Sequence, residues 1–218
     1  MSSLFQYFKS NNITLDGVIH VGAHRGEEVD QYEDLGAKNI IWVEPDPEVY
    51  KEMEVFLNRA QAGVQSHAYD YAVSNVDHEE VDFHRYHGPD AGYMIGNKGC
   101  GSLLQAKGRF ENWYKDTIKV ETITIDTLMD ENEHSLTDYQ LLNLDMQGAE
   151  MLALEGASKV IDSVSYITTE ATWQNPDYVG NVMFDELKEY LEGKGFVETE
   201  TVNHGPDWGD VLFVKEGT

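Results

Sequence analysis

The sequence predicts an α/β fold built on a largely parallel β-sheet. Short apolar runs alternate with segments of helical periodicity along most of the 218 residues, which is the rhythm of β-α-β units. Two further observations support this class. A buried-type strand at residues 17–21 runs directly into Gly22. A turn signal at residues 204–207 separates two final strands, which predicts an antiparallel hairpin at the end of the chain.

The first part of the chain supplies helices and strands in alternation. A leading helix is expected over residues 3–10, and a second over residues 27–36, where apolar side chains recur at three-residue spacing. The second strand is expected over residues 39–44. Asp46-Pro47 then provides an N-cap and a first helical residue, which predicts a third helix.

The middle of the chain breaks this alternation. A third strand is expected over residues 64–73, and strands with polar partners are expected over 81–83 and 118–125. Between them, residues 88–101 contain five glycines and one proline, a composition and length typical of a functional or mobile loop. We therefore expect residues 76–126 to form an inserted β-hairpin and loop before the fourth core strand.

The parallel rhythm resumes in the last third. We expect, in order, a strand over 141–145, a helix over 149–154, a strand over 165–170, a helix over 183–191 closed by Gly193, and strands over 196–202 and 211–214. No repeat or linker interrupts the pattern. Residues 1–218 are expected to form a single domain, with residues 1–16 as an N-terminal helical extension.

Composition narrows the function. The chain has 15 basic and 40 acidic residues, a net charge of −25, which argues against binding to nucleic acid or to an anionic membrane. Cys100 is the single cysteine, so neither an intramolecular disulfide nor a thiolate zinc cluster is expected. The first residues lack the apolar run of a signal peptide, and no run is long enough to span a bilayer. These features predict a cytoplasmic protein; the oligomeric state cannot be read from them.

A nucleoside-binding pattern follows the first strand. Gly22 and Gly26 flank the turn between that strand and the next helix, and Glu44 ends the second strand 22 residues after Gly22. Glycines let the backbone turn sharply beside a ligand, and an acid at this distance accepts hydrogen bonds from ribose hydroxyls. The alternative is an ordinary tight β–α turn with Glu44 at its rim.

The charges near this turn discriminate between two cofactors. Glu27 and Glu28 are expected in the first helical turn, where they suit the helix dipole but would repel the pyrophosphate of a dinucleotide. The middle glycine of the dinucleotide fingerprint is also replaced by Ala23-His24. S-Adenosylmethionine has a ribose, no phosphate and a cationic sulfonium, so the pattern favours it over NAD.

Four motifs carry a resemblance to a known family. They are residues 18–26 (VIHVGAHRG), 43–47 (VEPDP), 144–150 (LDMQGAE) and 154–157 (LEGA). With these motifs the chain resembles the FkbM family of S-adenosylmethionine-dependent methyltransferases, and residues 101–104 and 120–128 look like that family's middle segment. The resemblance extends from about Gly17 to Phe196.

The resemblance implies a class I, Rossmann-like methyltransferase fold with a seven-stranded, mostly parallel sheet and an antiparallel last strand. It also implies S-adenosylmethionine as cofactor and O-methylation of a small-molecule acceptor with a free hydroxyl, a sugar or natural product. The charge leaves a neutral or cationic acceptor favoured. The expected cofactor contacts are His20, Gly22, Ala23, His24, Gly26, Glu44 and Pro45, with the adenine near Asp70 and Ala72.

His20 departs from the class I pattern. Enzymes of this class often carry an acid in the first strand, two residues before the first glycine, and His20 occupies that position here. A neutral imidazole there would hydrogen-bond the loop or the methionine portion of the cofactor. The alternative is a buried histidine satisfied by a backbone partner.

Asp145 is the main catalytic candidate. It lies at the carboxyl end of a predicted strand, where open α/β sheets bind their ligands, and a positioned carboxylate can take the proton of an acceptor hydroxyl. The alternative is an N-cap for the helix that begins near Gly148. Gln147 and Glu170 are expected nearby as catalytic residues, and Glu150 is expected to brace the helix start.

The sequence leaves a divalent cation and two other functions as alternatives. Asp145 and Glu170 are only two of the several oxygen ligands that a hard divalent cation takes, so no metal site is assigned and a cation remains an alternative. An NAD-dependent oxidoreductase is a second reading of the glycine turn. A non-catalytic cofactor-binding module on a methyltransferase scaffold is the third, and His20 is the feature that favours it.

Overall fold

The computed structural model describes residues 4–60, 63–87 and 100–218. Its helices are α1 (Leu4–Ser10), α2 (Val29–Asp34), α3 (Pro47–Ala60), α4 (Ile125–Glu131), α5 (Glu150–Glu155), α6 (Ser158–Ser163) and α7 (Phe184–Gly193), with 3-10 turns at Gly108–Phe110 and Leu136–Asp138. Its strands are β1 (Gly17–Val21), β2 (Asn39–Val43), β3 (Gln65–Tyr69), β4 (Ala72–Val73), β5 (Glu80–His87), β6 (Tyr114–Ile123), β7 (Leu141–Leu144), β8 (Tyr166–Thr172), β9 (Phe196–Asn203) and β10 (Trp208–Lys215).

Seven strands form one sheet in the order β3-β2-β1-β7-β8-β10-β9. The first five of these are parallel to one another, whereas β10 is antiparallel to both β8 and β9. The predicted α/β class, the seven-stranded sheet and its antiparallel terminal hairpin are therefore confirmed. The strand order reverses between β1 and β7, and such a switch point is where open α/β sheets bind ligands.

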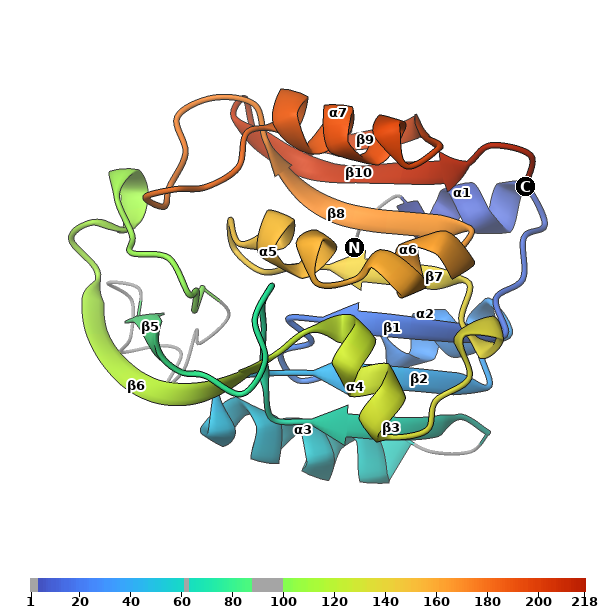
Figure 1. The fold of residues 1–218 in the computed structure, drawn as a ribbon, viewed down its shortest axis with the longest axis horizontal. Coiled ribbons are helices and arrows are strands. Elements are labelled where there is room, and N and C mark those ends of the chain that lie inside the picture. The colour runs from blue at the N-terminus through green and yellow to red at the C-terminus, as the bar shows by residue number, and fades with distance from the viewer. Residues whose placement is uncertain (1–3, 61–62, 88–99) are drawn as a thin grey trace.

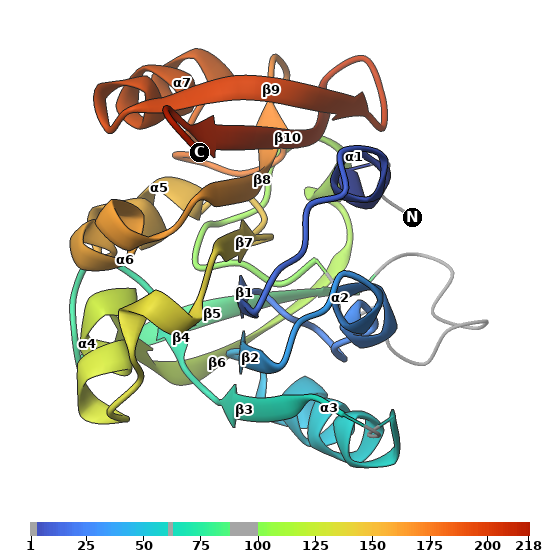
Figure 2. The same ribbon diagram turned by 90° about the vertical axis from the view of Figure 1, so that its right-hand side faces the viewer.

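Helices cover both faces of this sheet (Figures 1 and 2). Helices α1, α2 and α3 lie on one face, and α4 to α7 lie on the other. Alternate side chains of each strand pack into the two layers: in β1, Val18 packs with the first group of helices and Ile19 with the second. Burial on both faces explains why the central strands read as continuous apolar runs.

A second, three-stranded sheet lies beside the carboxyl ends of the parallel strands (Figure 1). Its order is β4-β6-β5, with β5 and β6 antiparallel over eight residue pairs from Glu80↔Glu121 to His87↔Tyr114. The predicted hairpin is therefore present, and it is longer than the residues 81–83 and 118–125 that suggested it. The predicted loop at residues 88–101 falls mostly on residues 88–99, outside the described part of the chain.

Some predicted boundaries are wrong for identifiable reasons. The expected strand over residues 64–73 is two strands, because β3 stops pairing where β2 ends and the chain then turns to pair β4 with β6. The expected strand over 118–125 ends at Ile123, because the Thr124 side chain accepts a hydrogen bond from Thr127 N and caps α4. Helix α6 was not predicted.

Helix α2 is also shorter than predicted. It begins at Val29, so Glu27 and Glu28 precede the first turn instead of occupying it. No helix in the described residues is long and apolar enough to cross a membrane.

Candidate functional site

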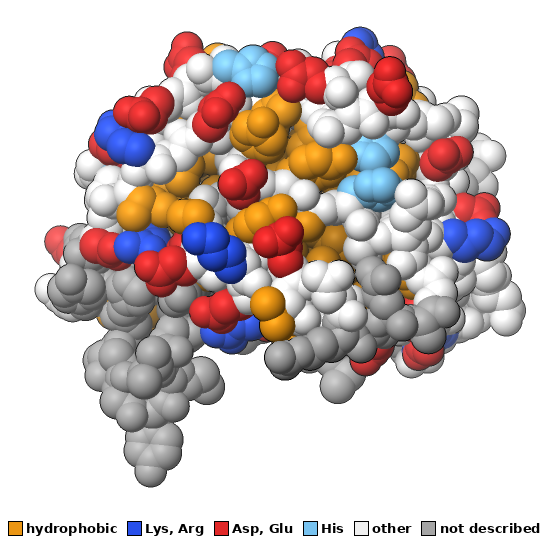
Figure 3. Space-filling model, turned by 90° about the horizontal axis from the view of Figure 1, so that it is seen from below, with side chains coloured by type: hydrophobic (Ala, Val, Ile, Leu, Met, Phe, Trp, Pro, Cys, Tyr) orange, Lys and Arg blue, Asp and Glu red, His pale blue; other side chains and the backbone are white. Residues whose placement is uncertain are grey.

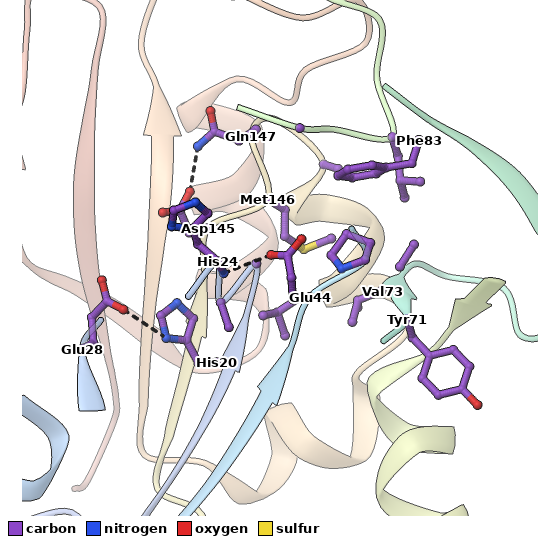
Figure 4. Close-up of a pocket in the computed structure, with 18 of the residues that line it drawn as sticks. His20, His24, Glu28, Glu44, Tyr71, Val73, Phe83, Asp145, Met146 and Gln147 are labelled. Carbon is purple, nitrogen blue, oxygen red and sulfur yellow. Dashed lines mark hydrogen bonds and ion pairs between the residues drawn. The ribbon is translucent and has the colours of Figure 1, made fainter. Parts of the chain in front are cut away.

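A cavity of about 370 Å³ lies at the carboxyl ends of β1, β2 and β7, and small-molecule sites typically measure ~300–1,000 Å³. Its walls come from four groups of residues: the loop after β1 (His20 to His24, Glu27, Glu28), the end of β2 (Glu44, Pro45), the turn after β7 (Asp145 to Gln147, Ala149), and the second sheet with its flanking segments (Tyr71 to Val73, Phe83, Gly101, Leu103). Figure 4 shows polar side chains at one end of it and Tyr71, Val73 and Phe83 at the other, with Glu44 between them.

The glycine turn brings two chain segments into backbone contact. Gly22 has φ +75°, and a Cβ on it would lie 1.8 Å from the carbonyl oxygen of Asp145, so only glycine fits there. Gly26 (φ +72°) does not line the cavity; a Cβ there would meet Leu57 of α3 at 3.0 Å. The position of Gly26 therefore does not support the predicted cofactor contact. Gly26 instead allows the loop to pack closely against α3.

Glu44 ties two loops together with its carboxylate. Oε2 accepts a hydrogen bond from His24 N at 3.0 Å, and Oε1 accepts one from Asp46 N at 2.9 Å. The residue is 7% exposed. Burial raises the pKa of Glu44 to about 7, an effect that the two backbone donors partly oppose. Each oxygen retains a second lone pair for a ligand hydroxyl.

His20 is buried among aromatic rings. It packs against Tyr32 of α2 and Trp42 of β2, with ring centroids 5.8 and 5.4 Å away. Its Nδ1 lies 3.2 Å from the Tyr32 hydroxyl and 4.0 Å from Glu28 Oε2. Burial lowers the pKa of His20 to about 4, against the pull of Asp145 and Glu27, so the imidazole is neutral at physiological pH. Its partner is a side chain, not the backbone group expected in the structural alternative.

His24 has a left-handed backbone conformation within the turn after β1. It has φ +48°, and its Nδ1 lies 3.0 Å from Glu27 Oε1. The hydrogen bond to Glu27 raises the pKa of His24, although partial burial opposes it. His24 Nε2 is buried and has no hydrogen-bond partner within the described residues. The bond to Glu27 therefore leaves His24 with one buried ring nitrogen that has no partner among the described residues.

Asp145, Gln147 and Glu170 come together as predicted. Gln147 Nε2 donates to Asp145 Oδ1 at 2.8 Å and to Glu170 Oε2 at 3.1 Å. Asp145 lines this cavity and also two smaller recesses beside it. Glu170 and Asp210 line the first recess, and Trp208 and Phe5 line the second. Asp145 is solvent-exposed at the rim of the cavity, and the surrounding protein nevertheless raises its pKa by desolvation, while the Gln147 hydrogen bond lowers it. Asp145 is thus a carboxylate with one oxygen fixed by an amide and access to several cavities.

Asp145 is not the N-cap of α5, because Ala149 occupies that position and makes no side-chain capping hydrogen bond. Glu150 Oε1 accepts hydrogen bonds from Met146 N at 3.0 Å and from Gly148 N at 3.1 Å, so Glu150 braces the start of α5 as predicted. Burial raises the pKa of Glu150 to about 7. Asp145 is left available for chemistry.

The opposite end of the cavity is apolar. Tyr71, Ala72 and Val73 line it, and Phe83 of β5 closes it from the second sheet (Figure 4). Asp70 is exposed and does not line the cavity, because the chain turns between β3 and β4. Of the two contacts expected for adenine, Ala72 thus lines the cavity and Asp70 does not.

Comparison with known proteins identifies the family. The model of the methyltransferase FkbM domain matches residues 20–198. The chain belongs to the FkbM methyltransferase family. A search of curated proteins found no match.

Solved structures agree on the fold. The magnesium protoporphyrin IX methyltransferase ChlM of Synechocystis PCC 6803, solved with bound SAM, is 10% identical, with a TM-score of 0.54 over 98% of this chain and 77% of that one. A putative tRNA (m1A22) methyltransferase of Streptococcus pneumoniae, also solved with S-adenosyl-L-methionine, is 11% identical, with a TM-score of 0.51 over 99% and 73%. A putative RNA methyltransferase of Pyrococcus horikoshii is 11% identical, with a TM-score of 0.50 over 97% and 79%. This FkbM domain therefore has the class I methyltransferase fold.

The sequence did not predict Phe83 and Leu103 as lining residues of the cavity, nor Ser102 and Tyr178 as partners of Gln147 behind it. Phe83 and Leu103 reach the cavity only because the second sheet folds over the first. Tyr178 O–H lies 3.3 Å from Gln147 Oε1, and Ser102 Oγ donates to the Gln147 backbone oxygen at 2.9 Å. Gln147 itself has φ +54°. The signals in the sequence for this region were the glycine-rich stretch at residues 88–101 and the family's middle segment at residues 101–104.

The carboxylates of Asp145 and Glu170 do not form a metal site with other described residues. The Gln147 amide, a donor, stands between Asp145 and Glu170. Over residues 4–60, 63–87 and 100–218, no three His, Cys, Asp or Glu side chains gather as a metal ion would require.

Proposed function

We propose that this FkbM domain binds S-adenosylmethionine in the 370 Å³ cavity and methylates a hydroxyl oxygen of a small molecule, a sugar or natural product, with Asp145 as the base. The observation that carries the proposal is the junction at Asp145: one carboxylate borders both the cavity that fits a nucleoside and the recesses beyond it.

The cavity suits S-adenosylmethionine in shape and charge. Glu44 offers two carboxylate oxygens to ribose hydroxyls, and Tyr71, Ala72, Val73 and Phe83 offer an apolar slot for adenine. Glu27, Glu28 and Asp145 surround the other end, which suits a cofactor with a sulfonium and an ammonium group. No Lys or Arg lines the cavity among the described residues, so the pyrophosphate of NAD would lack a cationic partner.

The residues around Asp145 suit proton removal from an acceptor. When bound, the cofactor supplies an electrophilic methyl group, and the acceptor oxygen must lose its proton as it attacks. Gln147 fixes Oδ1 of Asp145, which leaves Oδ2 to accept that proton. The raised pKa of Asp145 brings the carboxylate closer to the range of an efficient general base. Glu170, tied to the same amide, is positioned to orient the acceptor.

The structural neighbours include RNA and porphyrin methyltransferases, so they do not indicate one class of acceptor. We therefore infer the acceptor class from the surface charge of this chain. The net charge is −25. On the face seen in Figure 3, acidic side chains are scattered across the described surface, and basic ones do not gather into a continuous patch. A neutral or cationic small molecule is therefore favoured over an anionic polymer.

The test is in two steps. Isothermal titration with S-adenosylhomocysteine, with NAD as comparison, should give micromolar binding of the former alone. Transfer of an isotope-labelled methyl group to a panel of hydroxylated sugars and natural products, with an RNA arm, then identifies the acceptor. Binding without transfer to any member would favour a non-catalytic module, and preferential NAD binding would favour an oxidoreductase.

A further inference from the structure

A buried row of polar side chains crosses the main sheet beneath the cavity. The register places His20 of β1 opposite Asn143 of β7, and Asn143 opposite Thr168 of β8. All three face the side of the sheet that α2 covers, and Tyr32 of α2 reaches down to His20 and Asn143. Buried polar groups in a core require complete hydrogen bonding, so the direction of each bond in this row can be worked out.

The bonds run in one direction. Thr168 Oγ1 donates to Asn143 Oδ1 at 2.6 Å, and Asn143 Nδ2 donates to the Tyr32 hydroxyl oxygen at 2.9 Å. Tyr32 is 0% exposed, and among the described residues the acceptor within reach of its own proton is His20 Nδ1 at 3.2 Å. If Nδ1 carried a proton instead, the Tyr32 hydroxyl would receive two donors and its proton would have no partner, which is costly in a buried site.

The direction of this row fixes the tautomer of His20. A neutral imidazole with an acceptor at Nδ1 carries its proton on Nε2. His20 is 3% exposed, and its Nε2 has no hydrogen-bond partner among the described residues. Figure 4 shows this nitrogen turned away from Glu28 and toward Asp145, into the cavity. The two carboxylates that face the ring, Glu28 beside Nδ1 and Asp145 beyond Nε2, are separated by the imidazole.

The unused N–H points to an anionic part of the ligand. An N–H group donates, so it cannot bind the ammonium group of the cofactor. In the proposed function the ammonium and sulfonium groups lie beside Glu27, Glu28 and Asp145. S-Adenosylmethionine has one anionic group, the carboxylate of its methionine portion. His24 Nε2 is buried without a partner in the described residues, but His24 Nδ1 donates to Glu27, so Nε2 of that ring donates only when the imidazole is protonated. His20 Nε2–H is therefore the donor that this end of the cavity offers to that carboxylate.

Resting on the cofactor proposed above, we infer that His20 Nε2–H donates to the methionine carboxylate of S-adenosylmethionine, and that Tyr32 and Asn143 are positioning residues that hold the imidazole in this tautomer. The first-strand position thereby serves as a donor here, in place of the acid often found in this class.

The tautomer of His20 can be measured in the free protein, with no ligand and no assay of activity. Long-range proton–nitrogen NMR of the ¹⁵N-histidine-labelled protein, with the His20 signal assigned from His20→Gln, should show the proton on Nε2 at neutral pH. Tyr32→Phe should redistribute that proton toward Nδ1. The matched control is Tyr139→Phe, because the Tyr139 hydroxyl lies 3.2 Å from His134 Nδ1, outside the cavity. A proton on Nδ1 in the unmodified protein would overturn the tautomer.

The ligand contact is measured by calorimetry with two probes. S-Adenosylhomocysteine carries the carboxylate, and 5′-methylthioadenosine lacks the amino-acid portion. His20→Asn keeps an acceptor near Nδ1 for Tyr32 but removes the donor at Nε2; it should weaken S-adenosylhomocysteine binding about 10- to 100-fold and leave methylthioadenosine binding unchanged. His20→Gln, whose amide reaches the Nε2 position, should restore most of the affinity.

The outcomes separate the two proposals. Equal losses for both probes, or no loss for either, would overturn the role of His20 while leaving the cofactor assignment intact. Failure of both probes to bind the unmodified, folded protein would overturn the proposed function and the ligand contact with it, and the NMR result would then decide the tautomer alone.

Discussion

Replacing Glu44 by Gln tests the proposed nucleoside site most directly. The substitution keeps the size of the side chain and one carbonyl acceptor, but it turns the other oxygen into a donor. That NH₂ group must face either His24 N or Asp46 N, which now donate to Oε2 and Oε1 at 3.0 and 2.9 Å. A ligand hydroxyl at that oxygen also loses its charged acceptor.

The size of the effect follows from these contacts. One hydrogen bond to a charged group contributes about 1.5–3 kcal/mol, so the dissociation constant of S-adenosylhomocysteine should rise about 10- to 150-fold. The measurement is isothermal titration at pH 8, where the wild-type carboxyl is ionised. Glu54→Gln is the matched control, since Glu54 is exposed on α3, outside the cavity, and accepts a hydrogen bond from Tyr50.

The pH dependence gives an independent check. Burial raises the pKa of Glu44 to about 7, above the ordinary value of a glutamate. The protonated form has lost one acceptor oxygen, so wild-type affinity should be full above pH 7 and should fall as the pH drops through it. Glu44→Gln should remove this dependence. A variant that binds within a factor of about two of wild type, with the same pH profile, would refute the ribose role of Glu44.

Three further perturbations test other parts of the site. Asp145→Asn should leave S-adenosylhomocysteine binding measurable but lower turnover by about 10²- to 10⁴-fold once an acceptor is known; full activity would remove Asp145 as base. Gly22→Ala should lower the midpoint of thermal unfolding, because the new Cβ would meet Asp145 O at 1.8 Å, whereas Gly193→Ala, with nothing within 4 Å of its Cβ, should not. Phe83→Ala should weaken binding of S-adenosylhomocysteine and methylthioadenosine alike by about 5- to 100-fold, if stacking contributes ~1–3 kcal/mol; an unchanged affinity would place adenine elsewhere.

The sequence was sufficient for the parts of the site that lie at strand ends. Gly22, Glu44 and Asp145 each follow an apolar run, and parallel strands bring their carboxyl ends to one edge, so their proximity could be inferred. Gly26 and Asp70 do not line the cavity, because whether a loop residue faces a cavity depends on packing one turn away, on Leu57 for Gly26 and on the β3–β4 turn for Asp70. Local patterns do not encode such packing.

The residues that the sequence did not reveal act through long-range pairing. Phe83 reads as part of a short strand, and only the eight-pair ladder with β6 and its joint with β4 carry it over the cavity. Tyr32 reads as a core position of a helix, which it is; its hydroxyl becomes informative only when the register sets His20 beside Asn143. A sequence pattern identifies the buried face, but not which polar atom on it meets a partner.

In the proposed site, binding and stability are coupled, because the groups proposed to contact the cofactor also join parts of the fold. The Glu44 carboxylate joins the loop after β1 to the loop after β2, and the Tyr32 hydroxyl joins α2 to two strands while it orients His20. A loss of cofactor affinity on substitution therefore has two possible origins, a missing ligand contact or a displaced loop. Measuring unfolding and binding on the same variant separates them: a ligand contact weakens binding more than it lowers stability, whereas a displaced loop lowers both and also weakens methylthioadenosine.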